Sequence, residues 1–152
     1  MLHCQLLLTL LVGLSVAPLL NPQSAGPVDQ AKDFFARFVE LEQAYDITVA
    51  DLYADDAVIR NKRTYPTGEV RELTLPPAQY KQLIRQAMPL AKSRGDRSTY
   101  SKCGYKAEGA NVRITCSRYS ELKKYTTPYT LLVGPTRTGK WQILEELSES
   151  RP

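Results

Sequence analysis

The chain has 152 residues and a formal net charge of +4, enough for one domain with a substantial core but short for two. Hydrophobic residues make up 43% of the sequence and charged residues 24%, an ordinary globular composition that argues against a disordered chain. The small excess of positive charge is compatible with an anionic ligand, but such a balance usually only keeps a surface solvated.

The first 25 residues contain no Asp, Glu, Lys or Arg. Residues 6–17 read LLLTLLVGLSVA, an apolar run that has the length of a signal-peptide core and is short for a membrane span. We therefore predict an export signal over residues 1–25 and one domain over residues 26–152. Such a protein would be secreted or periplasmic, with no stable membrane span after cleavage. An uncleaved N-terminal anchor is the alternative.

The single histidine, His3, lies inside this predicted signal. The predicted mature domain therefore has no histidine, which excludes Ser-His-Asp and Cys-His nucleophiles, histidine bases and the usual zinc and iron sites. We expect no metal and no cofactor. Any catalysis would need carboxylates, tyrosines, lysines or arginines.

Three helices are predicted. The first opens near Pro27, and its apolar side chains recur every three or four residues; they are Phe34, Phe35, Phe38, Leu41 and Tyr45. Thr48 and Asp51 resemble a capping box, which predicts a short second helix over residues 48–54. The third helix opens at residues 76–77 with two prolines and keeps one apolar face through Met88; Pro89 is expected to kink or end it.

Strands are predicted over residues 57–61 and 69–75, before the third helix. A polar loop over residues 92–97 follows that helix, and the pattern then changes to a period of two. This change predicts strands over residues 98–106, 111–121, 129–133 and 140–147. Helices followed mainly by strands indicate an α+β domain in which a curved antiparallel sheet packs against three helices.

Two cysteines remain after the predicted cleavage. Residues 108–111, Glu-Gly-Ala-Asn, are a turn signal between two of the predicted strands. Cys103 and Cys116 lie at equal distances from the centre of this turn, so a hairpin places them opposite each other, within disulfide range. An oxidising compartment would let the bond form. Two buried free thiols are the alternative.

Residues 34–148 resemble the nuclear transport factor 2-like superfamily, which includes SnoaL-like proteins and ketosteroid isomerases. The features that carry the resemblance are the helix pair ending in DLYADDAVI (residues 51–59), the intervening third helix and the strand GKWQIL (residues 139–144). The resemblance implies a cone whose concave sheet and helices enclose a pocket. That superfamily contains enzymes, carriers and binding domains, so the fold does not assign a function.

The comparison with the isomerases in that superfamily argues against isomerase activity. Phe38 stands where the isomerases carry their oxyanion-binding tyrosine, and Asn61, with a one-residue gap between the helices, stands at their general-base aspartate. A phenyl ring cannot donate a hydrogen bond to an oxyanion, and an amide is not a useful base.

Strand alternation predicts the polar residues of the pocket. Trp141, Ile143 and Glu145 share one face of the last strand, and the apolar pair sets that face inward. Arg118 follows two apolar positions on the cysteine hairpin, and Tyr129 pairs with Glu145 in a plausible register. The candidate ligand-binding residues are Phe38, Tyr53, Arg118, Tyr129, Trp141 and Glu145. Alternatively, Glu145 lies beyond the rim in water and Arg118 forms a surface ion pair.

These observations favour an exported, non-enzymatic domain that binds a small hydrophobic or anionic ligand or a protein partner. One alternative is a histidine-independent lyase or isomerase using Glu145, Asp56 or Tyr129. Another is an immunity-type inhibitor that acts through its outer surface. The opposite sheet face is basic and aromatic, and we expect it to be solvated or to form a homodimer, not to bind nucleic acid; it carries Tyr100, Lys102, Arg113 and Tyr119.

Overall fold

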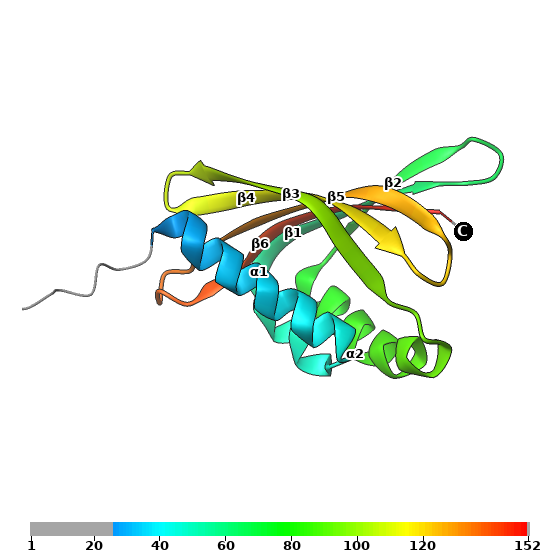
Figure 1. The fold of residues 1–152 in the computed structure, drawn as a ribbon, viewed down its shortest axis with the longest axis horizontal. Helices are drawn as coiled ribbons and strands as arrows, with labels where there is room; N and C mark the ends of the chain where they lie inside the picture. Colours follow the sequence, from blue (N-terminus) through cyan, green and yellow to red (C-terminus); the bar gives the residue numbers. More distant parts are fainter. Residues whose placement is uncertain (1–25, 152) are drawn as a thin grey trace, which may run out of the picture.

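The computed structural model describes residues 26–151, so the predicted export signal over residues 1–25 lies outside the described residues. A curved sheet forms one layer, and the helices lie on its concave side (Figure 1). The elements in chain order are α1 (Pro27–Gln43), η1, a 3-10 helix (Ile47–Leu52), β1 (Tyr53–Thr64), β2 (Val70–Leu75), α2 (Pro77–Arg94), β3 (Ser98–Glu108), β4 (Asn111–Ser120), β5 (Tyr125–Pro135) and β6 (Trp141–Ser150).

The six strands form one sheet in the order β2-β1-β6-β5-β4-β3. All neighbouring strands are antiparallel except β1 and β6, which are parallel. The sheet is unclosed because β2 and β3 lie at separate edges. The predicted α+β fold, a curved sheet packed against three helices, is confirmed.

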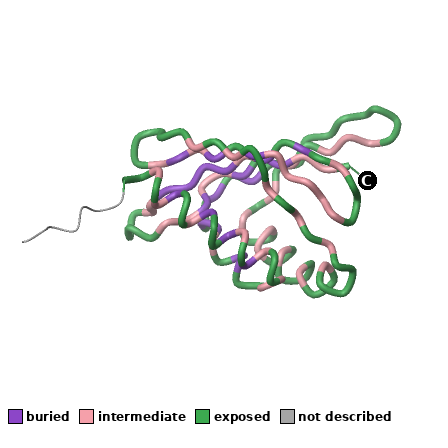
Figure 2. Tube along the Cα trace, in the orientation of Figure 1, coloured by how far each residue is buried: buried purple, intermediate pink, exposed green. Residues whose placement is uncertain are grey.

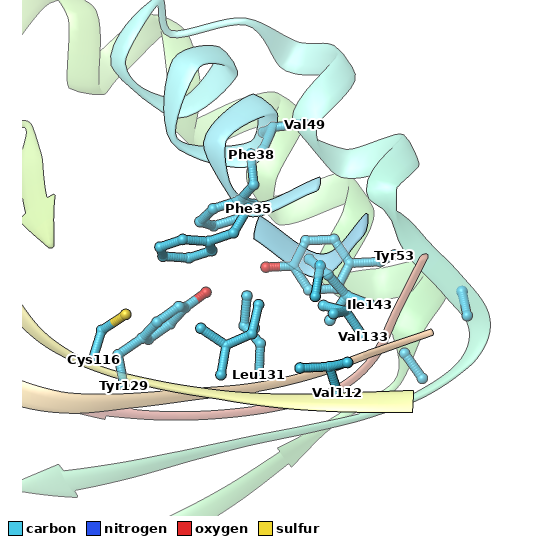
Figure 3. Close-up of a cluster of buried hydrophobic side chains, with 14 of the residues drawn as sticks. Phe35, Phe38, Val49, Tyr53, Val112, Cys116, Tyr129, Leu131, Val133 and Ile143 are labelled. Carbon is cyan, nitrogen blue, oxygen red and sulfur yellow. The ribbon is translucent and has the colours of Figure 1, made fainter. Parts of the chain in front are cut away.

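The core lies between α1 and the concave face of the sheet. Phe35 and Phe38 project from the apolar face of α1 onto buried side chains of β4, β5 and β6, such as Val112 and Leu131 (Figure 3). Burial is concentrated in the central strands and in the part of α1 that faces them (Figure 2). Each such large side chain contributes about 1.5–3 kcal/mol when removed from water, so this contact fixes α1 on the sheet.

The short second helix begins differently from the prediction. Its N-cap is Asp46, whose carboxylate accepts hydrogen bonds from the Thr48 backbone N–H at 2.8 Å and from the Thr48 hydroxyl at 2.7 Å. Thr48 is therefore a donor, and the predicted capping box was wrong because an aspartate two residues earlier is the better cap. The helix ends at Leu52, and β1 begins at Tyr53, four residues before the predicted strand.

Pro89 does not end α2. The helix continues to Arg94 and stops at Gly95, which adopts the left-handed conformation with φ 62° that commonly ends helices. The carbonyl that loses its partner to proline can be hydrated, since α2 has no fully buried residue and packs mainly against η1 and β1. None of the described helices is long and apolar enough to cross a membrane.

The predicted centre of the cysteine hairpin is confirmed by the register of β3 and β4, in which Glu108 pairs with Asn111 and Gly104 with Thr115. The register shifts beyond Gly104, where Lys102 adopts a positive φ of 52°. Cys103 and Cys116 form the predicted disulfide, with their Cα atoms 4.2 Å apart.

Candidate functional site

A β-bulge in β6 decides which acidic side chain enters the cone. Val133 of β5 pairs with Ile143, whereas the preceding Leu132 pairs with Glu145, so Leu144 is an extra residue on β6. Because side chains alternate with a period of two, one inserted residue moves every later side chain to the other face. Ile143 still points into the core, and the next inward side chain is Glu146.

Glu145 therefore lies on the convex face, and its expected place in the pocket was wrong. Its carboxylate accepts a hydrogen bond from Arg113 Nη1 at 3.2 Å, and Arg113 also holds Glu108 through two nitrogens at 2.9 and 3.0 Å. The Arg113 and Glu145 side chains are 31% and 40% exposed. The expected register also changes, since Tyr129 pairs with Ser148 in place of Glu145.

Glu146 is only 2% exposed and accepts hydrogen bonds from three tyrosines. Tyr53 and Tyr129 donate to one carboxylate oxygen, the latter at 3.1 Å, and Tyr80 donates to the other at 2.9 Å. Burial and the neighbouring carboxylate raise the pKa of all three phenols well above the ordinary value, so they remain protonated donors. The phenol groups of Tyr53 and Tyr129 face the space between α1 and the sheet (Figure 3).

Arg118 projects inward from β4 and lies over the ring of Tyr129, with its guanidinium carbon 5.2 Å from the ring centroid. One guanidinium nitrogen donates to the backbone oxygen of Glu149 at 3.1 Å. Within residues 26–151, no carboxylate forms an ion pair with Arg118. The guanidinium thus keeps donor capacity on the cavity side.

A second acid, Glu42, comes from the end of α1. Its carboxyl accepts a hydrogen bond from the Tyr100 hydroxyl of β3 at 2.7 Å. Burial raises the pKa of Glu42 to about 7, an effect that the hydrogen bond from Tyr100 and the charge of Arg118 only partly offset. Near neutral pH this group can therefore act as a carboxylate or as a carboxyl donor.

These groups line a cavity of about 90 Å³ between α1, η1, α2 and the sheet. Its apolar wall comes from both helices and η1, and its polar wall comes from the strands, the end of α1 and Tyr80 of α2. The lining residues are Phe38, Glu42, Val49, Tyr53, Tyr80, Ile84, Met88, Arg118, Tyr129 and Glu146. Drug-sized ligands occupy pockets of roughly 300–1,000 Å³, so this cavity accommodates only a small molecule.

The structure brings together four of the six residues proposed from sequence: Phe38, Tyr53, Arg118 and Tyr129. Trp141 packs against the core elsewhere and, like Glu145, is not among the lining residues.

Sequence reasoning missed Glu42, Tyr80 and Glu146. The first two had a signal, since Glu42 follows Phe38 by one helical turn and Tyr80 lies on the predicted apolar face of α2. Nothing in the sequence marks the bulge that selects Glu146.

The other polar candidates lie outside this cavity. Asp56 is exposed on β1, beside an open hollow that Asp55 and Arg137 also line. Asn61, at the position of the isomerase base, donates to the Ser148 hydroxyl at 3.0 Å and accepts from the Ser150 hydroxyl at 2.8 Å. Across the described part of the chain, no group of three or more acidic, cysteine or histidine side chains is placed to hold a metal ion.

Sequence comparison finds no matching protein family and no matching curated protein. Solved structures do match, among them a nuclear transport factor 2-like protein of unknown function from Pseudomonas putida (13% identity, 79% of this chain and 83% of that chain covered, TM-score 0.60). A second, from Shewanella oneidensis and also of unknown function, is 14% identical over 82% of this chain and 99% of its own, with a TM-score of 0.59. The chain therefore has the nuclear transport factor 2-like fold, as the sequence resemblance implied.

Proposed function

We propose that this protein is an exported domain that binds a small molecule in the cavity beneath α2 without transforming it. The observation that carries the proposal is Arg118, an inward-facing cation that lines the cavity and makes no ion pair within the described residues. The charges of Glu42 and Glu146 act on Arg118, but neither carboxylate forms an ion pair with it. A bound anion would supply a direct hydrogen-bonded partner.

The arrangement of Glu146 supports binding over catalysis. Its two oxygens already accept three phenol hydrogen bonds, and those phenols stay protonated because burial and the nearby carboxylate raise their pKa. A general base must take a proton from the substrate, and three of the roughly four acceptor sites of this carboxylate are already occupied. Glu146 and its tyrosines therefore form a rigid polar wall that orients a ligand.

Export is supported by the disulfide between Cys103 and Cys116, since such bonds persist in oxidising compartments. Mass spectrometry of protein recovered from its native cell tests this part of the proposal. We expect a mature N-terminus between residues 17 and 28 and an intact disulfide. An intact Met1 on the recovered protein would contradict export.

A lyase or isomerase that works without histidine is the second candidate, and one observation favours it. Burial raises the pKa of Glu42 to about 7, the range in which a carboxyl group exchanges protons most effectively at physiological pH. If Glu42 were the catalytic acid-base, Glu42→Gln would abolish turnover while leaving ligand affinity nearly unchanged. The binding proposal predicts no turnover in either protein.

Nuclear magnetic resonance with a set of small neutral, anionic and cationic fragments tests the binding proposal. We expect at least one fragment to shift the backbone resonances of the cavity-lining segments of α1, α2, β4 and β6. Resonances of the convex face around Arg113 and Glu145 serve as the internal control and should not move. Shifts confined to that face, or no shifts with any fragment, would overturn the proposal.

A further inference from the structure

The unfilled donors of Arg118 indicate the charge of the ligand. A guanidinium has five N–H donors in a planar fork that matches a carboxylate. Arg118 uses one of its nitrogens on the Glu149 backbone oxygen and rests its face on the Tyr129 ring. A small anion entering the cavity would meet donors that no ion pair within residues 26–151 occupies.

The two acids of the cavity do not oppose such an anion equally. Glu146 accepts hydrogen bonds from three phenols, and its charge acts on Arg118 without forming an ion pair. Glu42 has one oxygen bonded to Tyr100, and as a carboxyl it can donate from the other. The titratable and charged groups that face Glu42 are Asp96, after α2, Tyr100 of β3, Arg118 of β4, Tyr129 of β5 and Glu146 of β6.

The apolar lining and the volume of the cavity indicate the uncharged part of the ligand. Phe38, Val49, Ile84 and Met88 form an apolar side opposite the charged groups. A cavity of about 90 Å³ is far smaller than the roughly 300–1,000 Å³ of drug-sized pockets, so the ligand has only a few non-hydrogen atoms. Inorganic phosphate has no apolar part, so it would leave the apolar side of the cavity empty. As a dianion it would also place one more negative charge near Glu146 than a carboxylate does.

We propose that the cavity takes a small carboxylic acid with a short apolar tail, whose carboxylate is held by Arg118 and accepts a hydrogen bond from the Glu42 carboxyl. The tail lies against Phe38, Ile84 and Met88. This inference rests on the proposed binding function and names the ligand class for the same cavity.

Binding of the anion is coupled to the protonation of Glu42. Because burial raises the pKa of Glu42 to about 7, the carboxyl form predominates below that pH. Binding of the anion then takes up no proton, since Glu42 already carries it. Above it, the bound carboxylate stabilises the protonated form, so binding takes up one proton and the affinity falls up to about tenfold for each pH unit.

Calorimetric titration with propionate at about pH 6 and about pH 8.5, on the two sides of the Glu42 pKa, tests this coupling. We expect propionate to bind at least about tenfold more weakly at the higher pH, and neutral propionamide and cationic propylammonium to bind more weakly than propionate at pH 6. Arg118→Gln should abolish propionate binding. Arg113→Gln, a matched change on the convex face of the same strand, should leave it unchanged.

Glu42→Gln should bind propionate with the same affinity at both pH values, because an amide donates at either. If this variant does not fold, titrations of the unaltered protein in two buffers of different ionisation enthalpy measure the proton uptake directly. Equal affinity at both pH values, or preference for propionamide or propylammonium, would overturn the carboxylate inference and leave small-molecule binding standing. Failure of all three compounds and of every fragment would overturn both proposals.

Discussion

Glu145 and Glu146 are neighbours in sequence but occupy opposite faces of the sheet. The first forms a half-exposed ion pair with Arg113, and pairs of this kind contribute at most about 1 kcal/mol. The second is buried beneath three tyrosine hydroxyls. Hydrogen bonds to a charged group contribute about 1.5–3 kcal/mol each, so the two residues should respond very differently to the same substitution.

We predict that Glu146→Gln lowers the free energy of unfolding by about 2–3 kcal/mol, because the neutral amide weakens three charge-assisted hydrogen bonds and brings an N–H₂ group towards phenol donors. Glu145→Gln is the matched control and should cost at most about 1 kcal/mol. Urea denaturation of both variants measures the difference. Equal losses would show that β6 runs without the bulge at Leu144.

Glu42 makes the free energy of unfolding depend on pH between 4.5 and about 7. Its pKa rises from 4.5 to about 7 on folding because of burial, so between these values the folded protein binds more protons than the unfolded chain. Stability from this group is therefore full below pH 4.5 and declines as pH rises to about 7, by up to about 3 kcal/mol. Urea denaturation across this range should show the decline, and Glu42→Gln should flatten it. A variant as pH-dependent as the unaltered protein would contradict the assignment.

At the scale of elements, the disulfide ties edge strand β3 to β4 at the point where their register shifts. It closes a short loop with a sequence separation of 13. In the chain-entropy account, a bond over such a loop contributes about 3 kcal/mol. We predict that the double variant Cys103→Ala, Cys116→Ala unfolds at a lower urea concentration, with a loss of about 2–3 kcal/mol. An unchanged midpoint would show that the hairpin is held without the bond.

Sequence periodicity predicted α1 and β4 because each has one apolar face, seen in the phenylalanines of α1 and the alternating buried residues of β4. The short helix η1 was predicted from a capping pattern instead, and β2 has no fully buried residue. The boundaries were less predictable. The start of η1 depends on the carboxylate of Asp46, and the length of α2 depends on the exposure of Pro89. The bulge at Leu144 could not be predicted, because an apolar residue followed by two glutamates fits either face until the partner strands fix the register. The alternation therefore predicted Glu145 on the inward face, whereas Glu146 lies there, beside Arg118.

At the scale of the molecule, α1 and α2 cover the concave sheet unequally. α1 buries four side chains, whereas α2 buries none fully and packs mainly against η1 and β1. Local opening is easiest where few apolar contacts are buried. We predict that amide hydrogens of α2 exchange faster than those of α1, and that a cavity ligand slows exchange in α2 most. Equal protection of both helices in the free protein would contradict this difference.

Arg118, Glu42 and the Glu146–tyrosine wall surround the cavity that we propose as a site for a small ligand. A crystal structure of the protein grown with propionate below pH 7 would show whether the ligand lies there. The predicted result is propionate in the cavity, with its carboxylate on the Arg118 guanidinium and its ethyl group against Phe38. An empty cavity in which Arg118 forms an ion pair with Glu42 or Glu146 would contradict the proposed site, because the cation would then have its partner within the protein.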